Sequence, residues 1–356
     1  MNNFLQKKFP LIRTREEILS EIAENERLKE IYGRWKEEQR EEFLNFCTGV
    51  KGVKLLYDTF FKQIMNPDTK PERLEGFISE AIGKKVKILH VLPNESAKIA
   101  VEDSLMIMDI VVQLEDGSIA NVEVQKIGYL FSGQRSACYS ADLLIRQYKR
   151  QKEQSGKYFT YKDIKSVYTV ILFEKSEKLY HEFSEEVYIH HSKQCCDTEL
   201  EVDLLQEYTF ICLDIFKTVI HNKDRKIANK LEEWLVFLSE DDPEMILRLL
   251  ETAPEFGAFY EEVYELCRDT ERMMEMYSKE LQELDRNTVR YMVDEMQKEI
   301  TEQKKELESK DKELESKDKE IVNQRQELES KGKELESKDK EIEELKRLLR
   351  EQSGKE

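Results

Sequence analysis

The pattern of apolar positions predicts helices over the first part of the chain. Three helical stretches are expected: Thr14–Cys47, Val53–Met65 and Leu74–Ile82. Thr14 and Glu17 have the spacing of a capping box, which marks where the first stretch begins. Gly83 follows the third stretch, and glycine suits a helix C-terminus because it adopts positive φ without strain. We expect these helices to act as a scaffold.

The period of the pattern then changes from that of a helix to that of a strand. Two apolar runs flank Asp116-Gly117, an arrangement that predicts a β-hairpin. The expected strands are Lys85–Leu92, Leu105–Leu114, Ile119–Gln125, Lys165–Glu174, Glu186–His191 and Tyr208–Asp214, with a long helix at Gly133–Lys152. This order predicts an α/β fold, in which helices flank a mixed sheet.

The rest of the chain has a helical pattern throughout. Helices are expected at Arg225–Leu238, at Pro243–Leu250 and from Phe259 onward. From Val293 to Leu349 an apolar residue recurs at every seventh position, but the second apolar position of each heptad is mostly Lys or Gln. Because a stable coiled-coil seam needs both positions, three states stay open. They are a solvated helix that pairs weakly, a dimeric coiled coil and a disordered segment.

Charge separates the C-terminal segment from the remainder. Thr301–Glu356 holds 15 Lys/Arg and 18 Asp/Glu among 56 residues, too many to bury a core. We therefore expect four parts: a helical extension (1–50), an α/β core (51–216), a helical region (217–292) and a charged heptad-repeat helix (293–356). The net charge of −18 argues against a protein that coats DNA, since binding phosphate needs positive potential.

The composition also bears on the compartment of the protein. The first ten residues lack the apolar segment of a signal peptide, and no apolar run is long enough to cross a bilayer. Six cysteines occur without the spacing of a disulfide framework. We expect a cytoplasmic protein with reduced thiols.

The hairpin carries the candidate chemistry. Asp109 and Glu123 interrupt apolar strands, where a charge needs a partner, and Gln125 follows on the same face as Glu123. The turn brings Asp109 close to Glu123, but a slip of one residue would place them on opposite faces. On a shared face, the two carboxylates would suit a hard divalent cation such as Mg²⁺. Such an ion activates water and neutralises phosphate charge.

These residues resemble the D…(D/E)xK core of the PD-(D/E)xK nucleases. Four segments in order resemble, more narrowly, the PD-(D/E)xK nuclease family transposases, which are related to the recombination-promoting nucleases. They are Tyr57–Ile64, Phe77–Gly83, Ile107–Gln125 and Arg135–Lys149. The resemblance implies a restriction-endonuclease-like sheet and a Mg²⁺-dependent DNA endonuclease, with Mn²⁺ as the alternative ion.

The resemblance also implies roles for single residues. Asp109 and Glu123 would ligate the metal, with the Val124 carbonyl as a third ligand. Gln125 stands where the superfamily usually has a lysine, and a neutral amide orients water without supplying a cation. Substrate-binding roles would fall to Arg135, Tyr139 and Arg146, and the role of an accessory acid to Glu80.

Each assignment has an alternative that needs no catalysis. Asp109 and Glu123 could be buried partners of Arg135 or of a lysine on a strand face, and Arg135 and Tyr139 could be packing residues of a helix surface. Basic residues near Tyr148–Lys165 could contact phosphate or form a solvated helix end. For the whole protein, Gln125 and the acidic charge leave a second hypothesis: an inactive nuclease fold that serves as a binding scaffold and dimerises through its C-terminal helix. The metal-site chemistry would serve a DNA or an RNA backbone.

Overall fold

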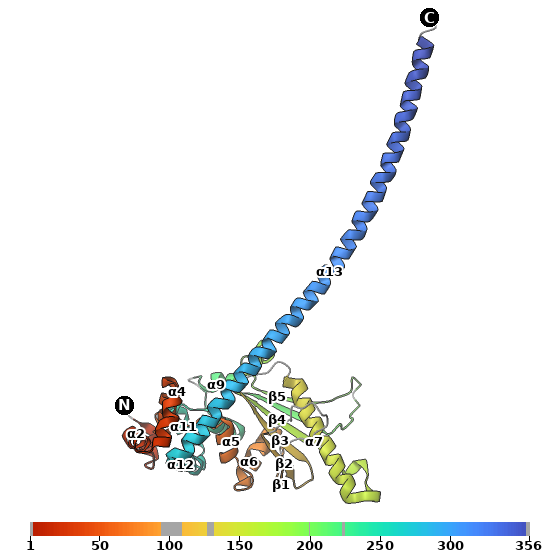
Figure 1. Cartoon of the computed structure of the whole chain (residues 1–356). Coiled ribbons are helices and arrows are strands. Elements are labelled where there is room, and N and C mark those ends of the chain that lie inside the picture. Colours follow the sequence, from red (N-terminus) through yellow and green to blue (C-terminus); the bar gives the residue numbers. More distant parts are fainter. Residues whose placement is uncertain (1–2, 94–108, 127–131, 199, 223–224, 354–356) are drawn as a thin grey trace. The chain divides into compact units, whose positions relative to one another are not determined.

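The chain forms a six-stranded mixed sheet flanked by helices (Figure 1). The computed structural model describes residues 3–93, 109–126, 132–198, 200–222 and 225–353. The strands are β1 Ile88–Leu92, β2 Ile110–Leu114, β3 Ile119–Gln125, β4 Val167–Phe173, β5 Ile189–Lys193 and β6 Gln206–Cys212, in the order β1-β2-β3-β4-β6-β5. β3, β4 and β6 run parallel, while the other pairings are antiparallel. The predicted mixed sheet is confirmed.

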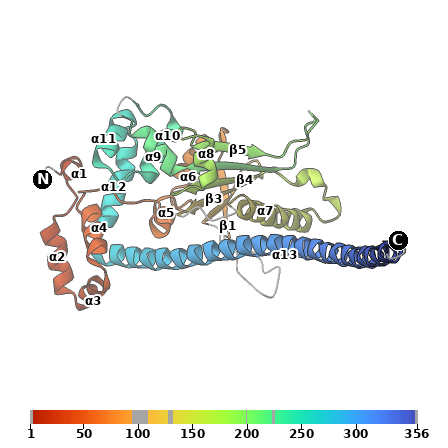
Figure 2. The same ribbon diagram turned by 90° about the horizontal axis from the view of Figure 1, so that it is seen from above.

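Helices cover both faces of the sheet (Figure 2). α7 Ser132–Ser155 packs Tyr139 and Leu143 against Val111, Ile119 and Val167, which lie on one face. α6 Pro71–Ile82 packs against the other face, where the alternate residues of the same strands join the main core. Because α7 covers the face with odd residue numbers on β3, it also lies over Asn121, Glu123 and Gln125.

The main core extends well beyond the sheet. It draws on α1 Phe4–Lys8, α2 Arg15–Glu24, α3 Glu26–Arg34, α4 Glu37–Cys47, α5 Asp58–Ile64, α9 Leu213–Ile220, α10 Lys230–Ser239, α11 Pro243–Thr252, α12 Phe256–Cys267 and the start of α13 Thr270–Ser353. Three short elements complete the list: η1 Gly156–Tyr158, η2 Tyr161–Asp163 and α8 Lys178–Phe183. The N-terminal and C-terminal helices thus share one core with the sheet.

Four of the expected helices differ from those in the structure. The helix expected over Arg225–Leu238 begins only at Lys230, and the one expected from Phe259 onward is divided into α12 and α13. The stretch expected from Thr14 to Cys47 is three helices, and Asn25 ends α2 and caps α3 with its side chain. The capping box of Thr14 and Glu17 is present. The helix expected from Val53 starts only at Asp58, because Leu55, Leu56 and Tyr57 are all buried in succession rather than along one stripe. Packing against the core overrides the local pattern there.

Several predicted ends are confirmed. Gly83 caps α6 at φ 68°, in the left-handed region that glycine tolerates. Gly117 has φ 88° in the turn of the β2–β3 hairpin. Pro243 is the first residue of α11. Residues 105–108 of the expected second strand lie outside the described residues.

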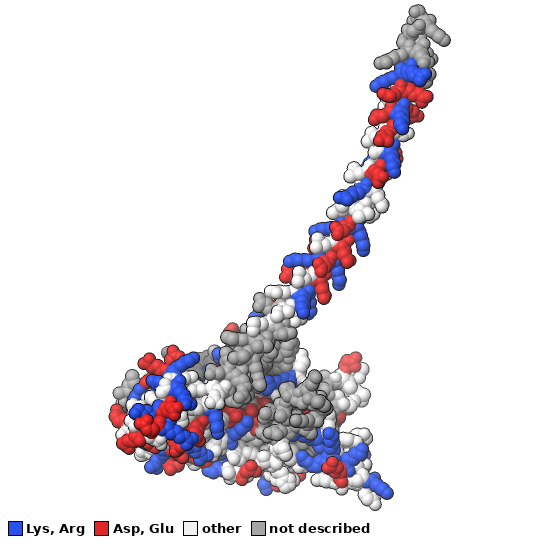
Figure 3. Space-filling model, in the orientation of Figure 1, with Lys and Arg blue, Asp and Glu red and all other residues white. Residues whose placement is uncertain are grey.

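The chain divides into two units, Met1–Tyr291 and Met292–Glu356. Within the second unit, the described residues continue α13 as one helix. Its apolar heptad residues from Leu307 to Ile342 are exposed, and Glu306–Lys310 and Glu313–Lys317 form ion pairs one helical turn apart at 2.7 and 2.6 Å. Both signs of charge alternate along this segment (Figure 3). No helix in the described part of the chain is long and apolar enough to span a membrane.

Candidate active site

The register of the β2–β3 hairpin places Asp109 and Glu123 on the same face. Ile110 pairs with Val122, so the residues one step beyond each, Asp109 and Glu123, lie opposite one another. The backbone N–H of Asp109 donates to Glu123 Oε1 at 3.3 Å, and the N–H of Val124 donates to Asp109 Oδ2 at 2.6 Å. The structure thus answers the question of register that the sequence left open.

Glu123 is buried and Asp109 is largely buried, and the charge of Asp109 makes ionisation of Glu123 harder. The exposed fraction is 3% for Glu123 and 17% for the Asp109 side chain. Burial raises the pKa of Asp109 to about 6, against the opposing charge of Lys62. Burial also raises the pKa of Glu123 well above its usual range, and the charge of Asp109 raises it further. Two like charges held together in this way are stabilised by a bound cation.

The same face of the sheet holds polar side chains that lack partners. Neither the oxygen nor the nitrogen of the buried Gln125 amide makes a hydrogen bond to any described residue. The hydroxyl groups of Thr169 on β4 and Ser136 on α7 are likewise buried without a partner in the described part of the chain. Because buried polar groups are normally hydrogen-bonded, this set can take up water or a polar ligand.

Two of the residues expected on α7 interact electrostatically with the carboxylates. Arg135 Nε donates to the hydroxyl of Tyr139 at 2.9 Å, and its guanidinium lies 5.3 Å from the Tyr139 ring centroid. Burial raises the pKa of Glu123, and the positive charge of Arg135 partly offsets that effect. Tyr139 is only 5% exposed and belongs to the core beneath α7. Arg135 is thus both a packed residue and a charge next to Glu123.

The structure does not bring Arg146 or Glu80 to this site. Arg146 pairs with Asp142 at 2.7 Å and donates to the Pro93 carbonyl at 2.9 Å. It shares a helix face with Arg135 but lies about 16 Å further along α7, since each residue adds 1.5 Å. Glu80 is exposed on α6, and its negative charge acts on Glu233 of α10. Arg146 lies on the same helix face as Arg135, and Glu80 belongs to a segment that carries the family resemblance. Neither fact was enough to place the residue near Asp109 and Glu123.

The sequence analysis missed two residues of α5. Lys62 Nζ lies 2.7 Å from Asp58 Oδ1 and 3.5 Å from Asp109 Oδ1, so it bridges the helix and the hairpin. Burial alone would lower the pKa of Lys62, but Asp109 and Asp58 hold it above its usual value. The lysine therefore stays protonated. The available signal was the Asp58–Lys62 spacing of one helical turn within Tyr57–Ile64, a segment that carries part of the family resemblance.

Lys126 points to the opposite face of β3, as the strand period predicts. It forms a buried ion pair with Glu280 of α13 and lies 4.9 Å from the Tyr57 ring centroid. The other oxygen of Glu280 accepts the backbone N–H of Asp58 at 2.9 Å. Lys126 is thus committed to a separate contact and does not replace the lysine missing at Gln125.

The donors around Asp109 suit a hard divalent cation. No group of three or more His, Cys, Asp or Glu side chains in the described residues is close enough to hold a metal ion. The site nevertheless supplies oxygen ligands, the type that Mg²⁺ and Mn²⁺ prefer. They are the carboxylates of Asp109 and Glu123, the Val124 carbonyl and the amide oxygen of Gln125, which makes no hydrogen bond to any described residue. Water and substrate oxygens would complete the coordination, as is common for Mg²⁺.

Comparison with known proteins agrees with this geometry. No curated protein and no solved structure matches the chain. A family model described as PD-(D/E)XK nuclease family transposase matches residues 55–292, about two thirds of the chain, and the match contains the sheet, α5 and Glu280. On this match, together with the mixed sheet and the paired carboxylates, the chain belongs to the PD-(D/E)XK nuclease family transposases.

Proposed function

We propose that this protein is a metal-dependent endonuclease that hydrolyses DNA phosphodiester bonds. The observation that carries the proposal is the pairing of Asp109 and Glu123, two buried carboxyl groups of raised pKa on one face of a hairpin. The charges of Lys62 and Arg135 offset the raised pKa values only in part, and perturbed carboxyl groups are frequent at catalytic sites. Membership of a nuclease family supports the same reaction class.

The residues of the site would have separate roles in this reaction. Asp109, Glu123 and the Val124 carbonyl would hold Mg²⁺ or Mn²⁺, which would lower the pKa of water and neutralise phosphate charge. The Gln125 amide oxygen would accept a hydrogen bond from the attacking water and orient its lone pair toward phosphorus. The P–O bond to the water oxygen would form as the opposite P–O bond breaks, and the proton that the water loses would pass through solvent to the leaving oxygen.

Two cations of the chain would stabilise the charge on the phosphate. Arg135 lies at the start of α7 next to Glu123, and Tyr139 fixes its guanidinium through the hydrogen bond to the hydroxyl. Lys62 lies against Asp109 from α5. We propose that Lys62 supplies the positive charge that the superfamily usually obtains from the lysine at the position of Gln125.

Nicking of supercoiled plasmid tests the proposal. The wild-type protein with Mg²⁺ or Mn²⁺ should nick the plasmid, and Asp109→Ala and Glu123→Ala should each lower the rate by about 10³-fold or more. Lys51→Ala, an exposed change outside the site, is the control. If all four proteins behave alike, the proposal is wrong, and the inactive scaffold suggested by Gln125 becomes the better account.

The proposal extends to setting and partners. We expect DNA as the substrate and a role linked to mobile elements or recombination, in the cytoplasm, where the six free cysteines would stay reduced. Self-association through α13 is expected to be weak, because most heptads beyond Ile300 offer only one apolar position.

A further inference from the structure

The C-terminal end of α7 is positively charged in an otherwise acidic protein. Residues 148–165 contain six Lys/Arg and two Asp/Glu, a net charge of +4, whereas the whole chain carries −18. Five lysines of this stretch are exposed, and we call them the α7-end patch: Lys149, Lys152, Lys157, Lys162 and Lys165. Lys and Arg side chains gather over this end of the helix in Figure 3.

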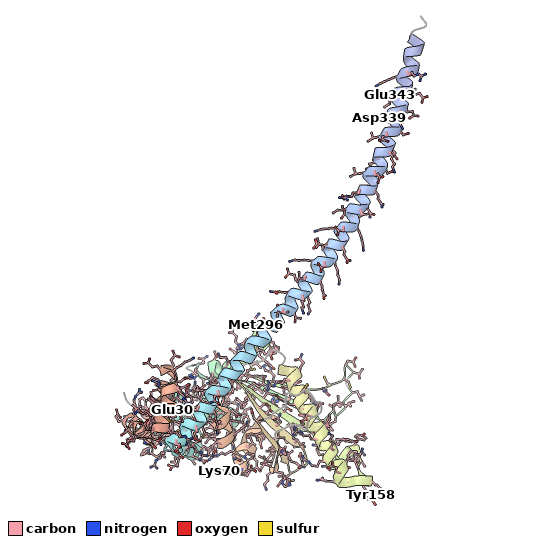
Figure 4. All side chains as sticks on the ribbon, in the orientation of Figure 1. Glu30, Lys70, Tyr158, Met296, Asp339 and Glu343 are labelled. Carbon is pink, nitrogen blue, oxygen red and sulfur yellow. The ribbon has the colours of Figure 1, made fainter. Side chains whose placement is uncertain are left out.

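Aromatic side chains hold the patch together. The rings of Tyr148 and Tyr161 stack at 6.1 Å, and Phe159 packs edge-on against both, at 5.4 and 5.5 Å. This cluster folds η1 and η2 back against the helix that precedes them. Tyr158 is 90% exposed at the tip (Figure 4), and Tyr161 is 75% exposed. Exposed rings among lysines are typical of a surface that binds a partner.

Hydrogen bonds also fix the patch relative to the candidate active site. Gln147 accepts the backbone N–H of Lys165 and donates to the Gly117 carbonyl at 3.4 Å. Arg150 donates to Gln113 of β2 at 3.0 Å. The same helix therefore carries Arg135 and Tyr139 at one end and the patch at the other. Ser155 lies 16 positions after Tyr139, which corresponds to about 24 Å along the helix.

We propose that the α7-end patch binds the phosphate backbone of duplex DNA. The contact would lie on the order of seven base pairs from the phosphodiester bond held at Asp109 and Glu123, because the patch is about 24 Å along α7 from Tyr139 and each base pair adds about 3.4 Å. This inference rests on the proposed function. Lysines act as point charges for phosphate and read no sequence, so the patch would position the duplex. Duplex rather than single-stranded DNA fits, because Tyr148 and Tyr161 stack on each other and Tyr158 projects alone at the tip, whereas single strands need a row of ring faces on which successive bases stack.

The test compares two full-length variants of equal charge change. The patch variant carries Lys149→Ala, Lys152→Ala, Lys157→Ala and Lys162→Ala, and the control variant carries Lys8→Ala, Lys29→Ala, Lys36→Ala and Lys51→Ala, all exposed positions. Binding to a fluorescent duplex of about 30 base pairs is measured by anisotropy in Ca²⁺ over a range of salt concentrations, and thermal melting confirms that both variants fold.

The patch variant should bind the duplex about 100-fold more weakly than wild type near 0.1 M salt, and the slope of log affinity against log salt should fall by about three. The control variant should stay within about twofold of wild type. Equal affinities of the two variants would overturn the inference. It would also be overturned if a duplex RNA or an anionic vesicle bound the wild type more tightly than DNA and lost that binding in the patch variant.

Plasmid nicking by the same proteins separates this inference from the proposed function. If the wild type nicks DNA and the two variants bind equally, only the docking surface is wrong. If the wild type nicks nothing but the patch variant alone loses duplex binding, the docking surface stands and the catalytic proposal is wrong.

Discussion

Two buried groups of charges lie on opposite faces of the end of β3, and they are built differently. On one face, Asp109 and Glu123 have the same sign of charge and raised pKa values, and the neighbouring Gln125 amide makes no hydrogen bond to any described residue. On the other face, Lys126 pairs with Glu280, whose second oxygen accepts a backbone N–H. The two groups are only a few residues apart in the sequence of β3.

The difference shows which of the two groups of charges stabilises the fold. The Lys126–Glu280 pair joins the hairpin to α13 and satisfies its own charges, as a structural ion pair does. The carboxylate pair leaves its charges without full compensation, which opposes folding in the absence of a ligand. Natural proteins keep such arrangements where function requires them. Neighbouring residues of one strand thus have opposite effects on the free energy of unfolding.

The largest effect is expected from breaking the satisfied pair. Glu280→Ala should lower the free energy of unfolding by about 3–5 kcal/mol, because it leaves Lys126 buried without its partner. Urea denaturation measures the change. The double variant Lys126→Met/Glu280→Leu removes both charges and should recover most of the loss. If Glu280→Ala changed stability by less than the double variant, the pair would not be structural.

A smaller effect is expected from the cation beside the carboxylates. Lys62→Met should lower the rate of plasmid nicking by about 10- to 100-fold, since one hydrogen-bonded charge contributes roughly 1.5–3 kcal/mol. Lys51→Met, at an exposed position before α5, is the matched control. The role assigned to Lys62 is ruled out if both variants nick at the wild-type rate.

Removal of the negative charge at Glu123, next to Asp109, should stabilise the folded protein. In the presence of a chelator at pH 7, Glu123→Gln should raise the free energy of unfolding by about 1–2 kcal/mol while it abolishes nicking. The folded-state pKa of Glu123 is raised, so wild type loses stability as the pH rises from the unfolded value near 4.3 through the folded value. The advantage of the variant should therefore shrink toward pH 4. An advantage that is constant with pH would contradict this explanation.

The smallest effect on stability is expected from the C-terminal segment of α13, which contributes to neither group of charges. Removal of residues 301–356 should change the free energy of unfolding of the remainder by less than about 0.5 kcal/mol, because its described side chains are exposed. Light scattering should give the mass of a single chain for both proteins at micromolar concentration. A dimer that dissociates on truncation would instead identify the heptad segment as a coiled coil.

Local signals in the sequence predicted much of the fold and part of the candidate site. Asp116-Gly117 predicted the hairpin, because few other residue pairs adopt that turn, and the strand period separated Gln125 from Lys126. The capping box at Thr14 and the cap at Gly83 located two helix ends. All of these signals act within a few residues of one another, where geometry follows directly from residue type.

Tertiary structure alone decided which charges meet. Lys62 reaches Asp109 across 47 positions, and Lys126 reaches Glu280 across 154. Arg146 was expected near the carboxylates but pairs with Asp142 instead. The buried run before Asp58 forms a turn rather than the expected helix for the same reason, since the surrounding core packs it on all sides. Contacts between distant residues depend on how whole elements pack, and no periodicity along the chain records that packing.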